Sequence, residues 1–159
     1  HRAAVIGTTI ALIAFAVVAV TVLLITRRTL PAPTIEALAV LARQQYADKN
    51  YDEAIATYQK LWKGTRGSAA VELLMGNTYY RKGDYPAAEK CYRDVLEKNP
   101  QSATALYNLG LTLFRQNRMG EASACYEDVI RLFGPANPIL ANRAKFALDL
   151  IAERTGRSS

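Results

Sequence analysis

Residues 69–102 have the sequence AAVELLMGNTYYRKGDYPAAEKCYRDVLEKNPQS, and the pattern of this stretch occurs once before it and once after it at the same spacing. A period of about 34 residues indicates a repeat protein, in which each unit stacks on its neighbours. The positions that keep the period are Gly76 with Gly110, Ala88 with Ala54 and Ala122, and Tyr92 with Tyr58 and Tyr126. The sequence therefore predicts three copies of one unit, over residues 35–68, 69–102 and 103–136.

Each unit is predicted to contain two helices joined by a polar turn, such as Lys82-Gly83-Asp84 in the second unit. The pair Asn99-Pro100 ends the second helix of that unit, because proline cannot continue a helix. A small residue in the first helix, Gly76 or Gly110, marks the place where the partner helix crosses closely. The repeated alanines and tyrosines of the second helices are predicted to pack in the core. We therefore expect an all-α solenoid of about three helix pairs.

Residues 137–154 predict one more helix, which would cover the open end of the array. Its apolar side is predicted to contain Ile139, Leu140, Ala144, Ala147, Leu148 and Ile151. The domain predicted from residues 35–159 thus consists of the repeats and this capping helix.

The N-terminal part of the chain differs from the repeats in composition, since residues 3–26 contain no charged side chain. About 24 residues in a helix span about 36 Å, which is enough to cross a bilayer core of about 30 Å. A cleavable signal peptide is the alternative, but its apolar stretch is shorter and ends in small residues. We expect a single transmembrane helix within residues 1–28, followed by a proline-containing linker at residues 29–34.

Two further expectations concern this anchor. Arg27 and Arg28 follow the apolar segment and outnumber Arg2 before it, which places the repeats on the cytoplasmic side of the membrane. Small residues recur every fourth position on one face of the segment, at Ala3, Gly7 and Ala11. Such a strip allows close packing against another helix in lipid, although alanine and glycine are also common in transmembrane helices in general.

The composition argues against catalysis and against nucleic-acid binding. The one histidine is His1, and the two cysteines, Cys91 and Cys125, are too far apart for a short metal or redox motif. A phosphate-binding glycine loop is also missing, so we expect no catalytic residues, no metal and no cofactor. The formal charge of +6 is spread among acidic and basic residues rather than clustered, as a nucleic-acid interface would need.

The sequence resembles the tetratricopeptide repeat family. The second unit matches the family pattern at Gly76, Tyr79, Gly83, Tyr85, Ala88, Tyr92 and Pro100, and the third at Leu106, Leu109, Gly110, Ala122 and Tyr126. The first unit keeps Tyr51, Ala54 and Tyr58 but has Ala42 in place of glycine. The resemblance implies a concave groove that is lined by the first helix of each repeat and that binds a peptide segment or a helix of a partner protein.

The resemblance also implies candidate groove residues. Asn77 and Asn108 stand where some members hold a peptide backbone, or they bridge adjacent helices. Leu73 stands where carboxylate-binding members have a lysine, so recognition of a free C-terminus is not expected. The other groove candidates are Tyr107 and Phe114 as aromatic contacts, Tyr79 and Tyr80 as aromatic residues near the turn, and Arg115 and Lys145 as basic residues that favour an acidic partner.

Two non-enzymatic functions follow from a repeat array on an anchor. The first is a scaffold, namely a subunit or assembly factor of a photosynthetic or respiratory membrane complex. The second is a membrane receptor that recruits a soluble chaperone, enzyme or peptide through the groove. Both predict protein partners and contact with the lipid bilayer.

Overall fold

The computed structural model describes residue 17, residues 20–21 and residues 33–156. The predicted anchor within residues 1–28 lies almost entirely outside this part of the chain, as do most of the linker residues. The residues that carried the predictions of packing and orientation lie outside it as well: Ala3, Gly7, Ala11, Arg27 and Arg28. Of the helices that are described, none is both long and apolar enough to cross a membrane.

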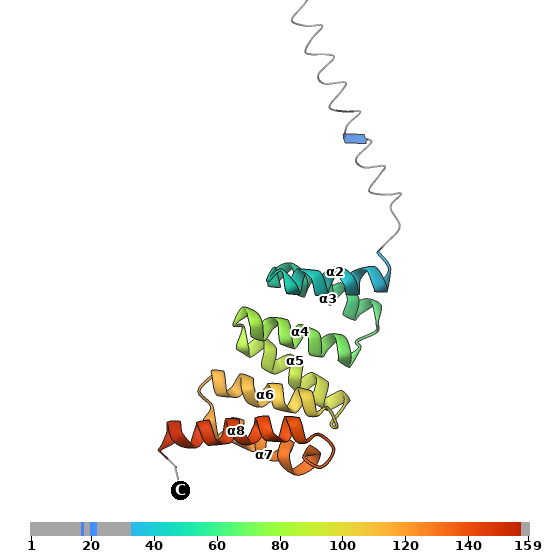
Figure 1. Ribbon diagram of the computed structural model, residues 1–159. Coiled ribbons are helices and arrows are strands. Elements are labelled where there is room, and N and C mark those ends of the chain that lie inside the picture. The colour runs from blue at the N-terminus through green and yellow to red at the C-terminus, as the bar shows by residue number, and fades with distance from the viewer. Residues whose placement is uncertain (1–16, 18–19, 22–32, 157–159) are drawn as a thin grey trace, which may run out of the picture. The chain divides into compact units, whose positions relative to one another are not determined.

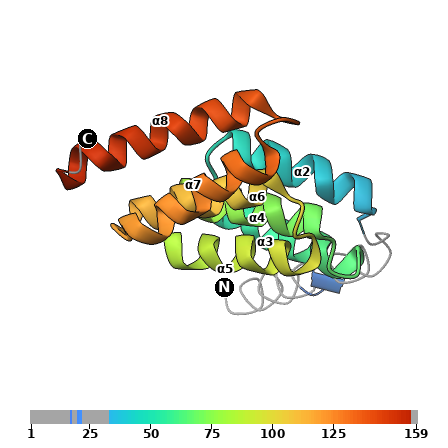
Figure 2. The same ribbon diagram turned by 90° about the horizontal axis from the view of Figure 1, so that it is seen from below.

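Between residues 33 and 156 the chain forms seven helices and no strand. Their bounds are α2 Ile35–Ala47, α3 Tyr51–Gly64, α4 Ala69–Lys82, α5 Tyr85–Lys98, α6 Ala103–Arg115, α7 Met119–Phe133 and α8 Pro138–Thr155. Consecutive helices pack against each other, and α2, α4, α6 and α8 follow one another along one side of the stack (Figures 1 and 2). The predicted all-α solenoid is confirmed for this part of the chain.

The turn inside each helix pair uses the same backbone conformation. Lys49, Gly83 and Asn117 occupy equivalent positions of successive repeats and have positive φ angles of 63°, 92° and 62°. A left-handed residue reverses the chain in little space, and glycine adopts it without strain from a Cβ atom. Three of the helices begin after polar residues whose side chains accept a backbone N–H, namely Asp84, Ser102 and Asn137.

Glycine allows the two helices of a pair to cross closely. A Cβ atom added to Gly76 would lie 2.8 Å from Cε1 of Tyr92, and one added to Gly110 would lie 3.0 Å from Cε1 of Tyr126. Both tyrosine rings are almost fully buried. The periodic glycines and tyrosines are therefore partners, since each ring fills the space that the missing side chain leaves.

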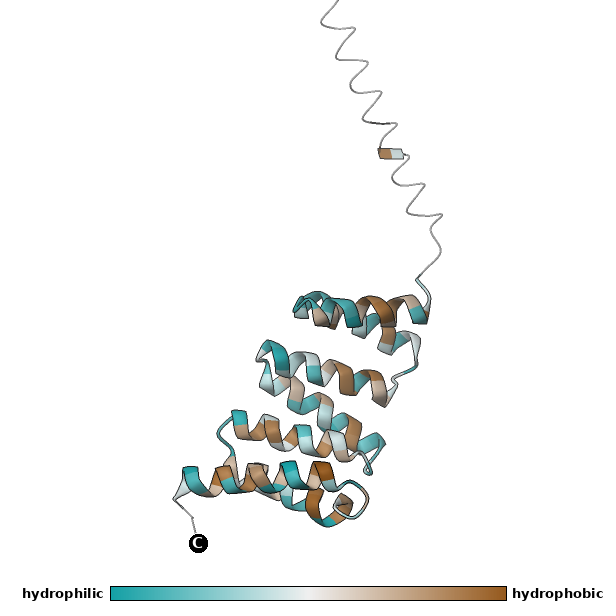
Figure 3. Ribbon diagram, viewed as in Figure 1, coloured by the Kyte–Doolittle hydropathy of each residue, from teal (hydrophilic) through white to brown (hydrophobic). Residues whose placement is uncertain are grey.

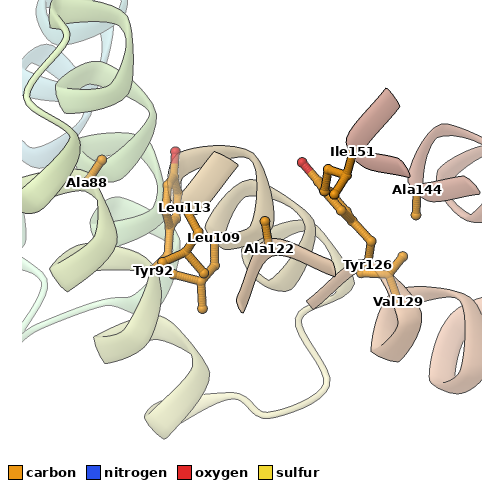
Figure 4. Packing of buried hydrophobic residues seen from close by; sticks show 9 residues of the cluster. All are labelled: Ala88, Tyr92, Leu109, Leu113, Ala122, Tyr126, Val129, Ala144 and Ile151. Atoms are coloured by element: carbon orange, nitrogen blue, oxygen red, sulfur yellow. The ribbon is translucent and has the colours of Figure 1, made fainter. Parts of the chain in front are cut away.

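The core consists of two clusters of buried residues. The larger one extends from α5 to α8 and includes Ala88, Tyr92, Ala122 and Tyr126 (Figure 4). The smaller one belongs to the first repeat and the start of α4, and it is built around Ala42, Ala54 and Tyr58. Tyrosine and alanine thus occupy equivalent core positions in all three helix pairs.

The last helix, α8, packs on α7 through Ala141, Ala144 and Ile151. The prediction that Ile139 belongs to this apolar side was wrong, because its side chain is 71% exposed. The reason is geometric, since the step from Ile139 to Ala144 turns an α-helix by about 140°.

Candidate functional site

A pocket of about 450 Å³ is lined mainly by residues of α2, α4 and α6. These helices follow one another along one side of the array (Figure 1). Its lining residues come from these three helices and from one tyrosine of α5: Tyr46, Asn77, Tyr80, Arg81, Tyr92, Asn108 and Leu111. The two asparagines that the sequence singled out therefore lie together, although they belong to different repeats.

The side chains of Asn77 and Asn108 are joined by a hydrogen bond. Asn108 donates from Nδ2 to Oδ1 of Asn77 at 2.9 Å, and the Tyr92 hydroxyl donates to the same oxygen at 2.8 Å. Bridging between helices, one of the two roles considered from the sequence, is thus formed in the structure. Within residues 33–156, Nδ2 of Asn77 and Oδ1 of Asn108 have no hydrogen-bond partner, so the pair still offers an unpaired NH₂ group and an unpaired carbonyl oxygen.

Tyr92 fixes the orientation of this pair. Its ring is 1% exposed and packs against Gly76, one residue before Asn77. Burial raises the pKa of the Tyr92 phenol well above its usual range, so the hydroxyl stays protonated and acts as a donor. Because the donor approaches Oδ1 of Asn77, the amide must turn its NH₂ group away from Tyr92.

The electrostatic character of the pocket is basic. Arg81 lies in its lining, and none of the lining residues is acidic. Arg115 lies beside it on α6, with its guanidinium carbon 5.8 Å from the ring centres of both Tyr80 and Tyr85. Lys145, the other predicted basic residue, is exposed on α8 and is not part of the lining.

The structure places the two predicted aromatic contacts beside residues of α8. Tyr107 packs its ring against Tyr126 at 5.6 Å and lines a second, shallower hollow of about 430 Å³ with residues of α8. Phe114 is half-buried, with the guanidinium of Arg154 5.5 Å from its ring centre. Both remain accessible from α6, but neither touches the pocket around Asn77.

Three lining residues were not among the sequence candidates, namely Tyr46, Arg81 and Leu111. Two of them carried a usable signal in the repeat itself. Tyr46 stands one full repeat before Tyr80, and Arg81 stands one full repeat before Arg115. Leu111 gave no signal, since a leucine on a helix of this composition is expected in the core.

The described residues provide little for chemistry. No group of three or more histidine, cysteine, aspartate or glutamate side chains is placed to hold a metal ion in this part of the chain. Both cysteines are free, and burial raises the pKa of each thiol to about 11, so neither is a thiolate at neutral pH. What the site offers is hydrogen-bonding and positively charged groups.

Comparison with known proteins identifies the repeat. Two models of the tetratricopeptide repeat match the sequence, one over residues 73–138 and the other over residues 45–97. None of the curated proteins matches the sequence.

Several solved structures share the fold. The type III secretion chaperone SycD of Yersinia enterocolitica, in complex with a peptide of the translocator YopD, superposes with a TM-score of 0.69 and 20% identity, covering 79% of this chain and 97% of that one. PcrH in complex with the chaperone-binding region of PopD superposes with a TM-score of 0.69 and 22% sequence identity, covering 80% of this chain and 97% of PcrH. The first tetratricopeptide repeat domain of Spaghetti (RPAP3), bound to an HSP90 peptide, superposes with a TM-score of 0.67 and 21% sequence identity, covering 80% of this chain and 97% of that one.

Proposed function

Since the chain contains tetratricopeptide repeats over residues 45–138, we propose that the pocket around Asn77 and Asn108 holds the main chain of an extended segment from a partner protein. The proposal rests on the polar groups that the hydrogen-bonded side-chain amides of Asn77 and Asn108 leave unpaired. The pocket lining contains two asparagines that retain an unpaired NH₂ group and an unpaired carbonyl oxygen, and a peptide group presents an acceptor and a donor in return.

The rigidity of the pair favours binding. The amide of Asn77 is held by a nearly buried tyrosine and by a second asparagine, so little side-chain freedom is lost when a ligand arrives. A main-chain contact of this kind is independent of the ligand's side chains. Selectivity for one partner must therefore come from the residues around the pair.

The chemistry of the pocket favours an internal segment over a free C-terminus. Leu73 lies on α4 one helical turn before Asn77, and its apolar side chain packs against the core. An apolar residue there gives no counter-ion for a terminal carboxylate. The neighbours bound to a YopD peptide and to an HSP90 peptide support peptide binding by this fold, while the identity of the ligand is set by each chain's own residues.

The apolar segment at residues 3–26 is the basis for a second part of the proposal, a membrane anchor that presents the repeats at a membrane surface. The array then acts as a receptor for a soluble partner. A cytoplasmic orientation follows from Arg27 and Arg28, and a reporter enzyme fused after Ser159 tests it by being active on one side only. The role of subunit or assembly factor in a membrane complex stays a prediction, because it depends on the same segment.

Photo-crosslinking tests the groove. A photoreactive amino acid at Leu111, in the pocket lining, is compared with one at Lys60, which is exposed on α3. We expect a discrete crosslinked partner from position 111 and none from position 60, with the crosslink mapping to one continuous segment of that partner. Equal crosslinking from both positions, or none from either, contradicts the proposal.

A further inference from the structure

Aromatic residues recur where the two helices of each pair meet at the turn. Tyr46 of α2 lies 6.0 Å from Tyr51 of α3, and Tyr80 of α4 lies 5.5 Å from Tyr85 of α5, measured between ring centres. In the third repeat Phe114 takes the position of the first tyrosine. The array therefore presents an aromatic surface once per repeat.

An arginine from a later helix lies against each of these surfaces. Arg115 is 5.8 Å from the ring centres of Tyr80 and Tyr85, and Arg154 is 5.5 Å from that of Phe114. Arg81 lines the same pocket as Tyr46, and the closeness of the Tyr46 hydroxyl raises the pKa of the Arg81 guanidinium. A ring face or hydroxyl orients a guanidinium and leaves some of its five N–H donors free.

These three residues, Arg81, Arg115 and Arg154, are called here the arginine ladder. All three are exposed, and within residues 33–156 none of them forms an ion pair. Other arginines of the array are paired with carboxylates, namely Arg93, Arg118 and Arg131. The ladder is thus held in place by aromatic residues and retains an uncompensated positive charge.

The ladder runs along one edge of the array. The C-terminal ends of α4, α6 and α8, which carry the three arginines, lie on the same edge in Figure 1, and Figure 3 shows that these ends are hydrophilic. The helices α4 and α6 contact each other, and the axes of helices in contact are about 8–10 Å apart. An extended peptide in the polyproline II conformation has three residues per turn and advances about 3.1 Å per residue, so every third side chain returns to the same face after about 9 Å, which matches this step of the ladder.

We infer that the arginine ladder selects an extended acidic segment in which a glutamate or aspartate occurs at every third position. The inference rests on the proposed function of the groove, because the same segment would place its main chain on Asn77 and Asn108. Bidentate pairing between a planar guanidinium and a carboxylate gives the selectivity that the asparagines do not supply.

Binding of defined peptides to the full chain in non-ionic detergent tests the inference by fluorescence anisotropy. The probe is a labelled decapeptide with glutamate at positions 2, 5 and 8 among alanine and serine. Two peptides serve as controls, one with the three glutamates adjacent and one with glutamine in their place. We expect the spaced peptide to bind most tightly and the glutamine peptide to bind least, with affinity falling as salt is added.

Variants of the chain identify the residues responsible. Each of Arg81→Gln, Arg115→Gln and Arg154→Gln should weaken binding of the spaced peptide about threefold, in line with exposed ion pairs. Arg66→Gln is the matched control, since Arg66 is exposed, unpaired among the described residues and off the ladder, and the change in net charge is the same. The corresponding lysine variants keep the charge but lose the planar group, so they should recover only part of the affinity.

Three results would overturn the inference: no binding of the spaced peptide, equal binding of the adjacent-glutamate peptide, or an effect of Arg66→Gln equal to that of the ladder variants. Tighter binding of a single-stranded decathymidylate than of the spaced peptide would also overturn it, by showing a general affinity for polyanions. If the peptide test fails while Leu111 still crosslinks a partner, only this inference is lost. If crosslinking from Leu111 fails, the proposed function is lost with it.

Discussion

Asn108 on α6 donates a 2.9 Å hydrogen bond to Asn77 on α4, so two groove amides from different helix pairs form one unit across a repeat boundary. Tyr92 on α5 completes the unit with a second hydrogen bond to Asn77. The contact that orients the ligand-facing amides is therefore also a contact that joins two repeats. Stability and binding are coupled at this point of the array.

Replacing Tyr92 by phenylalanine tests this coupling. Tyr92→Phe removes the donor to Asn77 and should lower the free energy of unfolding by about 0.5–1.5 kcal/mol. The matched control is Tyr126→Phe, at the same register one repeat later, whose hydroxyl has no hydrogen bond within residues 33–156. Denaturant unfolding followed by circular dichroism should show no loss for the control. Equal losses would mean that the bond to Asn77 contributes nothing.

The close crossing at Gly76 predicts a steric penalty. A methyl group in Gly76→Ala would meet the Tyr92 ring at 2.8 Å, and overpacking of this kind costs about 1–3 kcal/mol. Gly120→Ala on α7 is the control, because a Cβ atom there meets nothing within 4 Å and alanine favours the helix. The midpoint temperature of thermal unfolding should fall for Gly76→Ala and rise slightly for Gly120→Ala. A neutral Gly76→Ala would contradict the packing described for the core.

Two lysines of α5 form ion pairs of the same length in different surroundings. Lys98 bonds Glu72 at 2.5 Å, where the glutamate side chain is 8% exposed, whereas Lys90 bonds Asp94 at 2.5 Å on the surface. Lys98→Met leaves a buried carboxylate unpaired and should lower the free energy of unfolding by about 3 kcal/mol, while Lys90→Met, at an exposed pair, should lower it far less. Chemical denaturation measures the free energy of unfolding of both variants. Similar losses would show that the ion pair with Lys98 does not stabilise the buried Glu72 carboxylate.

Glu89 predicts a pH dependence of stability. Burial alone raises the pKa of Glu89, but hydrogen bonds from Arg93, Gln116 and Arg118 outweigh it and lower the pKa to about 2. A lowered pKa in the folded state contributes stability above the usual value near 4.5, and this contribution is lost as the pH falls from about 4.5 towards 2.

The variant Glu89→Gln should therefore be less stable than the native chain by about 2 kcal/mol at pH 7. This difference should shrink between pH 5 and pH 3, as measured by urea unfolding at each pH. If the two proteins differ in the free energy of unfolding by the same amount at pH 5 and at pH 3, the pKa of Glu89 is not lowered in the folded state.

The repeat period predicted much of this architecture, because the residues that set it act locally. Gly83 at a left-handed turn and Tyr92 against Gly76 are each required by the geometry of one helix pair. The site was less predictable, since the bond between Asn77 and Asn108 depends on the relative placement of two repeats. Arg81 was missed for the same reason, as its partner Tyr46 belongs to the preceding unit.

The predictions for α8 show where local patterns fail. Ile139 looks like a core residue in the sequence, but it lies in the first turn after Pro138 and its side chain is exposed. Tyr107 and Phe114, predicted as aromatic contacts of the groove, lie on α6 beside residues of α8. The path of the last helix across the array sets the surroundings of these three residues, and no periodicity in the sequence specifies it.

Co-purification of the partner with an Asn77→Asp variant tests the central claim most directly. Aspartate keeps an oxygen that accepts from Tyr92 and Asn108, and it replaces the unpaired NH₂ donor by a carboxylate oxygen. Asn50→Asp, in an exposed turn, is the control with the same change of charge. We expect the partner to be lost from Asn77→Asp and retained by Asn50→Asp at unchanged thermal stability, whereas equal recovery from both variants would show that the Asn77 amide does not hold the ligand.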